Sequence, residues 1–138
     1  MSEHITQQRI LLACGSGNTR LWRNNVGTGW AGQATKVTSG NRQAIAQALR
    51  PGDVVIRQGR PLHAGLCVGS SDLIGYRVVD RVAQFVALEV KSPTGRPTAQ
   101  QTQFVDHINA VGGCAGIVRS VEDAQTVLGS DAKAEPIR

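Results

Sequence analysis

The chain has 138 residues, of which 41% are hydrophobic and 18% are charged, a composition that supports one folded domain with a core of its own. Fifteen Lys and Arg residues outnumber ten Asp and Glu residues, so the formal net charge of +5 favours a polyanionic partner such as nucleic acid. The chain contains no run of 18 apolar residues and its N-terminus is polar, so we expect neither a membrane span nor a signal peptide.

In chain order, the hydrophobic pattern predicts a helix over 2–13, a strand over 21–26 and a helix over 41–49. Strands are predicted over 53–56, 64–68, 73–79 and 85–91. A helix over 98–111, which begins with a Thr98–Gln101 capping box, a strand over 114–118 and a helix over 120–128 complete the order. We therefore predict a single α/β domain over 1–129, with a mixed central sheet flanked by helices, and a disordered tail over 130–138.

The three cysteines, Cys14, Cys67 and Cys114, lie far apart in the sequence. Their odd number argues against a disulfide framework, and no Cys/His group has the spacing of a zinc site. We expect all three to be small buried residues, and we expect the protein to function in a reducing compartment such as the cytoplasm.

Three charged residues form the candidate site. Glu89 and Lys91 lie two positions apart in an otherwise apolar strand, so their side chains share one face while Val90 points to the other. Two opposite charges near the end of a buried strand cost desolvation energy, and a hairpin through 80–81 can bring Asp72 beside Glu89. Residue types and spacing leave two interpretations open: a metal-assisted phosphodiester hydrolysis site, or a structural ion pair with Asp72 in an ordinary turn.

The hydrolysis interpretation follows from the chemistry of these groups. Two carboxylates and a backbone carbonyl can hold Mg²⁺, which prefers oxygen ligands and keeps several waters. The metal lowers the pKa of a bound water, and a neighbouring lysine can stabilise the charge that develops on the phosphate.

The segments around these residues resemble known nuclease motifs. GSSDLIG at 69–75 followed by Glu89-Val90-Lys91 resembles the motif of the PD-(D/E)XK nucleases, with Ser71 in place of the proline. LWRNNVG at 21–27, LEVKSPTGR at 88–96, Gln101, GGCAG at 112–116 and SVEDA at 120–124 resemble, in the same order, the VRR-NUC (virus-type replication-repair nuclease) family. The resemblance covers nearly the whole chain.

This resemblance implies a restriction-endonuclease-like core and an endonuclease that cleaves DNA with Mg²⁺, or alternatively Mn²⁺. Asp72, Glu89 and the Val90 carbonyl would be metal ligands, and Lys91 would be the catalytic lysine. Gln101 would lie at the edge of the site, which is compatible with its capping role. Glu3, on the first helix, would complete the site, with Gln7 as the alternative.

The resemblance also bears on the partners. Stand-alone bacterial and viral members are similar to junction-resolving enzymes, which implies a cytoplasmic homodimer that acts on four-way (Holliday) junctions, since two sites are needed to nick two strands symmetrically. A flap-, nick- or end-directed nuclease and a non-catalytic nucleic-acid-binding module are the alternatives. The Gly-rich segment 15–19 lacks the lysine of a phosphate loop, so we expect no nucleotide cofactor.

The candidate DNA contacts lie outside the carboxylate site. Arg23, Asn24 and Asn25 follow the first predicted strand, and Arg96 lies in the loop after the strand that carries Glu89. All four have donors that suit phosphate oxygens. Trp22, beside the first group, is interpreted as a core residue.

Overall fold

The structure is a computed structural model that describes residues 2–28, 35–56, 60 and 62–129. Its contacts divide the chain into two compact units, which we call the sheet unit (Met1–Val26 and Gly65–Arg138) and the inserted unit (Gly27–Ala64). The prediction of a single domain over 1–129 did not include this division. The predicted tail over 130–138 lies outside the described residues.

The sheet unit is a mixed four-stranded sheet with helices on both faces, which confirms the predicted α/β class. Its strands lie in the order β1-β4-β5-β6, the first three antiparallel and β6 parallel to β5, with α3 as the crossover between the parallel pair. In chain order its elements are α1 (Glu3–Cys14), β1 (Thr19–Arg23), β4 (Leu73–Val79), β5 (Val82–Val90), α3 (Ala99–Ala110), β6 (Cys114–Val118) and α4 (Val121–Leu128).

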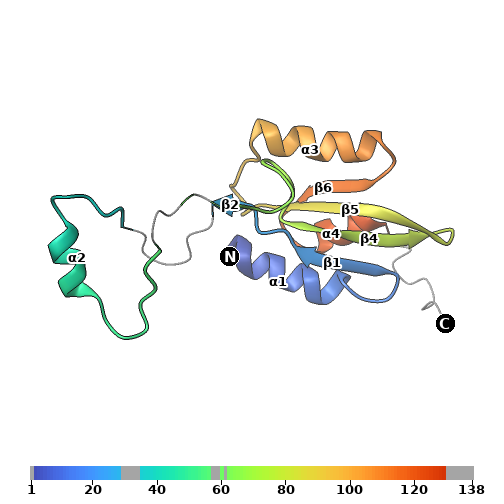
Figure 1. The fold of residues 1–138 in the computed structure, drawn as a ribbon. Helices are drawn as coiled ribbons and strands as arrows, with labels where there is room; N and C mark the ends of the chain where they lie inside the picture. The colour runs from blue at the N-terminus through green and yellow to red at the C-terminus, as the bar shows by residue number, and fades with distance from the viewer. Residues whose placement is uncertain (1, 29–34, 57–59, 61, 130–138) are drawn as a thin grey trace. The chain divides into compact units, whose positions relative to one another are not determined.

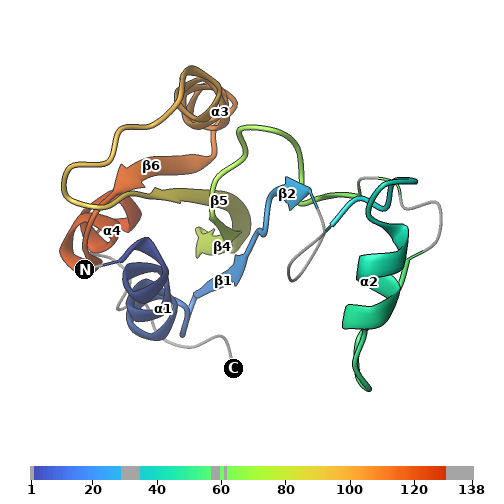
Figure 2. The same cartoon turned by 90° about the vertical axis from the view of Figure 1, so that its left-hand side faces the viewer.

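Two apolar layers hold the helices on this sheet. Helices α1 and α4 pack together on one face, and α3 covers β5 and β6 on the other (Figures 1 and 2). The alternation along β5 explains this arrangement, because Leu88 and Val90 point to the α1 and α4 side while Ala87 points to α3. The larger core lies on the α1 and α4 side and contains Ile10, Cys14, Leu21, Leu73, Val86, Leu88, Val90, Cys114, Val118, Ala124 and Leu128.

A two-residue hairpin sets the register of β4 against β5. Asp80 and Arg81 both have positive φ, of 49° and 67°, as a type I′ turn requires. This turn pairs Val79 with Val82 and, six residues along, Leu73 with Leu88. The hairpin predicted through 80–81 is thereby confirmed, and it fixes what lies opposite the end of β5.

Helix α3 begins as the sequence predicts. The Thr98 hydroxyl accepts a hydrogen bond from the backbone N–H of Gln101, and the Gln101 side chain accepts one from the backbone N–H of Thr98. This reciprocal capping box satisfies two N–H groups that a helix start otherwise leaves unpaired.

The inserted unit contains β2 (Gly27–Thr28), α2 (Arg42–Ala48) and β3 (His63–Ala64), and β2 pairs with β3. The helix predicted over 41–49 is confirmed. The strands predicted over 53–56 and 64–68 are wrong, apart from Ala64. Val54, Val55 and Ile56 are exposed and pair with no strand, so their apolar run had the composition of a strand without the neighbour that a strand needs.

Two expected core positions are also wrong. Trp22 is 55% exposed, because β1 is an edge strand of the sheet and α3 covers β5 and β6 instead. Cys67 is exposed, whereas Cys14 and Cys114 are buried as expected.

Candidate active site

The site lies where β4 begins and β5 ends. Because Leu73 pairs with Leu88, Asp72 lies opposite Glu89, and the Asp72 Oδ2 atom accepts a hydrogen bond from the Val90 N–H at 2.9 Å. The register therefore brings the two side-chain carboxylates together, as the sequence predicted for the pair.

Glu89 and Lys91 form an ion pair inside the protein. Lys91 Nζ lies 2.7 Å from Glu89 Oε1, and the two side chains are 12% and 0% exposed respectively. The Lys91 ammonium and the backbone N–H of Asp72 are the donors that face the Glu89 carboxylate, and both lower its pKa.

Burial perturbs both carboxylates. It raises the pKa of Asp72, and the charge of Glu3 adds to this, while the Val90 N–H and the Lys91 ammonium oppose it. Burial likewise raises the pKa of Glu89, with Lys91 opposing the shift and the charge of Asp72 adding to it. Two carboxylates share one ammonium in a site of low dielectric, so the site has a net affinity for a proton or a cation.

Glu3 reaches the same region from α1. Its Oε1 atom accepts a hydrogen bond from the backbone N–H of Ser92 at 2.9 Å, two residues beyond Val90. The structure thus brings Glu3, rather than Gln7, into contact with the segment that follows β5. Glu3 nevertheless lies at the border of the site, because no three His, Cys, Asp or Glu side chains of the described residues are placed to share one metal ion.

The donor set suits a hard divalent cation. It consists of the Asp72 and Glu89 carboxylates, and the family resemblance adds the Val90 carbonyl; all of these ligands are oxygen atoms. Mg²⁺ binds through one or two carboxylates and keeps several waters, so it does not need a third acidic side chain. The residues present therefore fit Mg²⁺.

Asn24 holds the segment that carries Asp72, a role the sequence did not suggest. Its Nδ2 donates to Ser70 Oγ at 2.8 Å and to the Ser71 carbonyl at 3.0 Å, and its Oδ1 accepts from the Leu66 N–H at 3.0 Å. Its backbone N–H donates to the Asp72 carbonyl at 2.7 Å. Both amide N–H groups are used within the protein, which points to a positioning role for Asn24 and away from the predicted phosphate contact.

The other predicted residues are distributed around the site. Arg23 Nη1 lies 3.1 Å from the His4 Nδ1 atom, while Asn25 and Arg96 are exposed. Gln101 uses its Oε1 in the cap of α3. DNA contacts by Arg23, Asn25 and Arg96 stay predictions, as does a catalytic role for Gln101.

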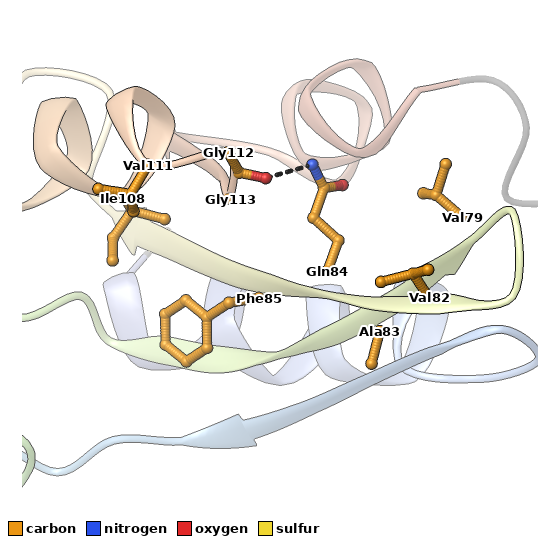
Figure 3. A pocket seen from close by; sticks show the side chains of 9 residues that line it. All are labelled: Val79, Val82, Ala83, Gln84, Phe85, Ile108, Val111, Gly112 and Gly113. Carbon is orange, nitrogen blue, oxygen red and sulfur yellow. Dashed lines mark hydrogen bonds between the residues drawn. The ribbon is translucent and has the colours of Figure 1, made fainter.

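A surface hollow of about 580 Å³ lies at the opposite end of β5 (Figure 3). Val79, Val82, Phe85, Ile108 and Val111 line it, together with Ala83, Gln84, Gly112 and Gly113. Gln84 spans it by donating from Nε2 to the Gly112 carbonyl at 2.8 Å. It has no charged lining residue, so it offers nothing for phosphodiester chemistry.

Comparisons of this chain with protein-family models, with curated proteins and with solved structures gave no match. Within the described residues, no helix has the length and apolar composition that crossing a membrane requires.

Proposed function

We propose that this protein is a Mg²⁺-dependent DNA endonuclease that hydrolyses phosphodiester bonds at the site of Asp72, Glu89 and Lys91. The observation that carries the proposal is the state of Glu89: its side chain is fully buried, it is paired with Lys91 at 2.7 Å, and a second carboxylate, that of Asp72, lies close enough for its charge to raise the pKa of Glu89. Such an arrangement costs desolvation energy, and perturbed carboxylates of this kind cluster at functional sites.

Each residue has a defined role in this proposal. Asp72 and Glu89, with the Val90 carbonyl, would hold Mg²⁺, which when bound neutralises phosphate charge and lowers the pKa of a coordinated water. Lys91 is held in place by its ion pair with Glu89, so its ammonium can stabilise negative charge on the phosphate. Glu3, at the border of the site, can accept a hydrogen bond from a substrate water, and the Gln101 Nε2 group is a further donor.

The topology supports the resemblance to the VRR-NUC family. The elements of the sheet unit follow the order α1-β1-β4-β5-α3-β6. The carboxylates lie at the end of the antiparallel pair β4–β5, just before the α3 crossover to β6. This order is compatible with a restriction-endonuclease-like core. The net charge of +5 is consistent with DNA as partner. Action on four-way junctions, homodimerisation and a cytoplasmic location complete the proposal, and they derive from the family resemblance alone.

The test compares Asp72→Asn with the wild type on three end-labelled substrates: a four-way junction, a flap and a linear duplex. Asparagine keeps an oxygen that can accept the Val90 N–H but removes the charge that a cation needs. Asp106→Asn is the matched control, since Asp106 is an exposed acid on α3. Each reaction is run with Mg²⁺ and with EDTA.

We expect cleavage by the wild type and by Asp106→Asn with Mg²⁺, and none by Asp72→Asn or in EDTA. Symmetric nicks at the junction would support a resolving enzyme, and preference for the flap would replace that part of the proposal. Cleavage that survives in Asp72→Asn, or DNA binding without any cleavage by the wild type, would overturn the nuclease assignment.

A further inference from the structure

Most of the net positive charge of the chain comes from one segment, because that segment has few acidic residues. Residues 27–64 contain five basic residues and one acidic residue, a net charge of +4, whereas the remaining 100 residues contain ten basic and nine acidic residues. The inserted unit therefore carries nearly all of the net charge of +5 in little more than a quarter of the chain. The sheet unit, which contains the carboxylate site, is close to neutral.

The place of this segment in the topology is unusual. Strands β1 and β4 are antiparallel neighbours that pair from Thr19 with Arg77 to Arg23 with Leu73, and such neighbours are ordinarily joined by a short hairpin loop. Here residues 24–72 separate them, and the β2–β3 pair of Gly27 with Ala64 and Thr28 with His63 closes the base of the insertion. A connection of this length is far longer than a hairpin needs, and it contains β2, α2 and β3.

The four basic side chains that the structure describes in the inserted unit form no ion pair among the described residues. These residues, Lys36, Arg42, Arg50 and Arg60, are all exposed. The only acidic residue, Asp53, uses its carboxylate to accept the backbone N–H of Arg50 in a turn. The four cationic groups are thus available to an external anion.

The described residues of the inserted unit form little apolar core. Helix α2 buries no side chain, and apolar residues on either side of it are exposed, among them Val37, Leu49, Val54 and Ile56. A segment that combines free cationic groups with little buried apolar area is typical of elements that are completed by a polyanion.

We infer that the inserted unit 27–64 is the principal phosphate-binding element of this protein, and that it supplies most of the salt-dependent affinity for the nucleic-acid backbone. The inference rests on the proposed function for its choice of DNA as partner. Within the sheet unit, Asn24 binds both the Leu66 N–H and the Asp72 carbonyl, so the segments that precede and follow the insertion are tied together. In this inference, hydrolysis takes place at the Asp72 site of the sheet unit, and the inserted unit binds the DNA backbone.

The test measures binding of a fluorescein-labelled duplex by anisotropy in EDTA, so that cleavage plays no part. The neutralised variant carries Lys36→Gln, Arg42→Gln, Arg50→Gln and Arg60→Gln, and a charge-preserving variant carries Lys36→Arg, Arg42→Lys, Arg50→Lys and Arg60→Lys. A third variant, Arg20→Gln with Arg81→Gln, removes two exposed cations from the sheet unit, for comparison with Arg42→Gln and Arg50→Gln alone. Circular dichroism and thermal unfolding establish that each variant is folded.

The plot of log K against log salt has a negative slope, and each lost phosphate contact reduces its magnitude by about 0.9. The magnitude should therefore be smaller by roughly 2 to 4 in the neutralised variant than in the wild type. At about 0.1 M salt the neutralised variant should bind at least about tenfold more weakly. The charge-preserving variant should bind like the wild type, and the sheet-unit pair should cost less affinity than the inserted-unit pair. Equal losses from the two pairs, or a slope unchanged in the neutralised variant, would overturn the inference.

Failure of this inference and failure of the proposed function are distinguishable. A wild type that binds DNA through the inserted unit but cleaves nothing would sustain the inference and remove the nuclease. A neutralised variant that cleaves DNA and retains wild-type affinity would support the nuclease and overturn the inference about the inserted unit. Binding to anionic lipid vesicles with no binding to DNA would overturn the inference by assigning the basic surface to a membrane.

Discussion

Replacement of Lys91 by methionine isolates the buried ion pair. Methionine keeps an unbranched stem of similar length and removes only the charge, which leaves Glu89 at 0% exposure with no counter-ion. Breaking a buried pair in this way costs about 3 to 5 kcal/mol, because the desolvation of the remaining charge is no longer offset. We therefore expect Lys91→Met to lower the free energy of unfolding by about 3 kcal/mol or more near neutral pH.

The cost should depend on pH in a defined direction. Glu89 can relieve its burial by taking up a proton, and its pKa, already raised by burial, rises further once Lys91 is gone. A carboxyl group with a raised pKa in the folded protein stabilises the fold at low pH and loses that stabilisation as the pH rises through the folded-state pKa. The destabilisation should therefore shrink as the pH falls toward about 5, by as much as about 1.4 kcal/mol for each pH unit over the titration.

Urea unfolding at neutral pH and at about pH 5 tests this reasoning. The double variant Glu89→Gln/Lys91→Met should recover most of the lost stability, because it leaves no buried charge. Arg96→Met, an exposed cation in the loop after β5, should change stability by no more than about 0.5 kcal/mol. A loss below about 0.5 kcal/mol for Lys91→Met, or a loss that does not vary with pH, would refute the buried pair.

Three further outcomes are expected. In the metal-free protein the raised pKa of Asp72 lowers the free energy of unfolding as the pH rises above about 4. Mg²⁺ should therefore raise the melting temperature near neutral pH, and it should do so less at lower pH, where protons compete for the carboxylate. In Asp72→Asn, Mg²⁺ should not change the melting temperature. Asn24→Ala should lower the free energy of unfolding in urea by about 2 kcal/mol, because it leaves the buried Ser70 hydroxyl and Ser71 carbonyl without their donor. Asn25→Ala, at an exposed position, should lower it by less than about 0.5 kcal/mol. Equal losses would contradict the positioning role of Asn24. Gly75→Ala should lower stability by more than about 3 kcal/mol, since a Cβ there would overlap the Arg20 carbonyl, while Gly27→Ala meets no atom within 4 Å; a folded, stable Gly75→Ala in the same melts would show that β1 and β4 pair less closely.

Local pattern predicted the elements that local forces define. The capping box at Thr98, the hairpin through 80–81 and the alternation along β5 follow from neighbouring residues, and the structure confirms all three. Strands over 53–56 and 64–68 were predicted wrongly because an apolar run becomes a strand only beside another strand. Trp22 was misplaced for a related reason: whether a strand face is buried depends on which helix covers it.

Periodicity in the sequence predicted which three charged residues make up the candidate site. Glu89 and Lys91 share a face because side chains alternate along a strand, and a hairpin through 80–81 was inferred to bring Asp72 beside Glu89, as the structure shows. Three features could not be predicted in this way: Glu3 meets Ser92 across 89 positions of sequence, Asn24 is hydrogen-bonded inside the protein, and residues 27–64 form a unit of their own. These features depend on which distant segments pack together, and packing is set by the register of the whole sheet rather than by the periodicity of any one segment.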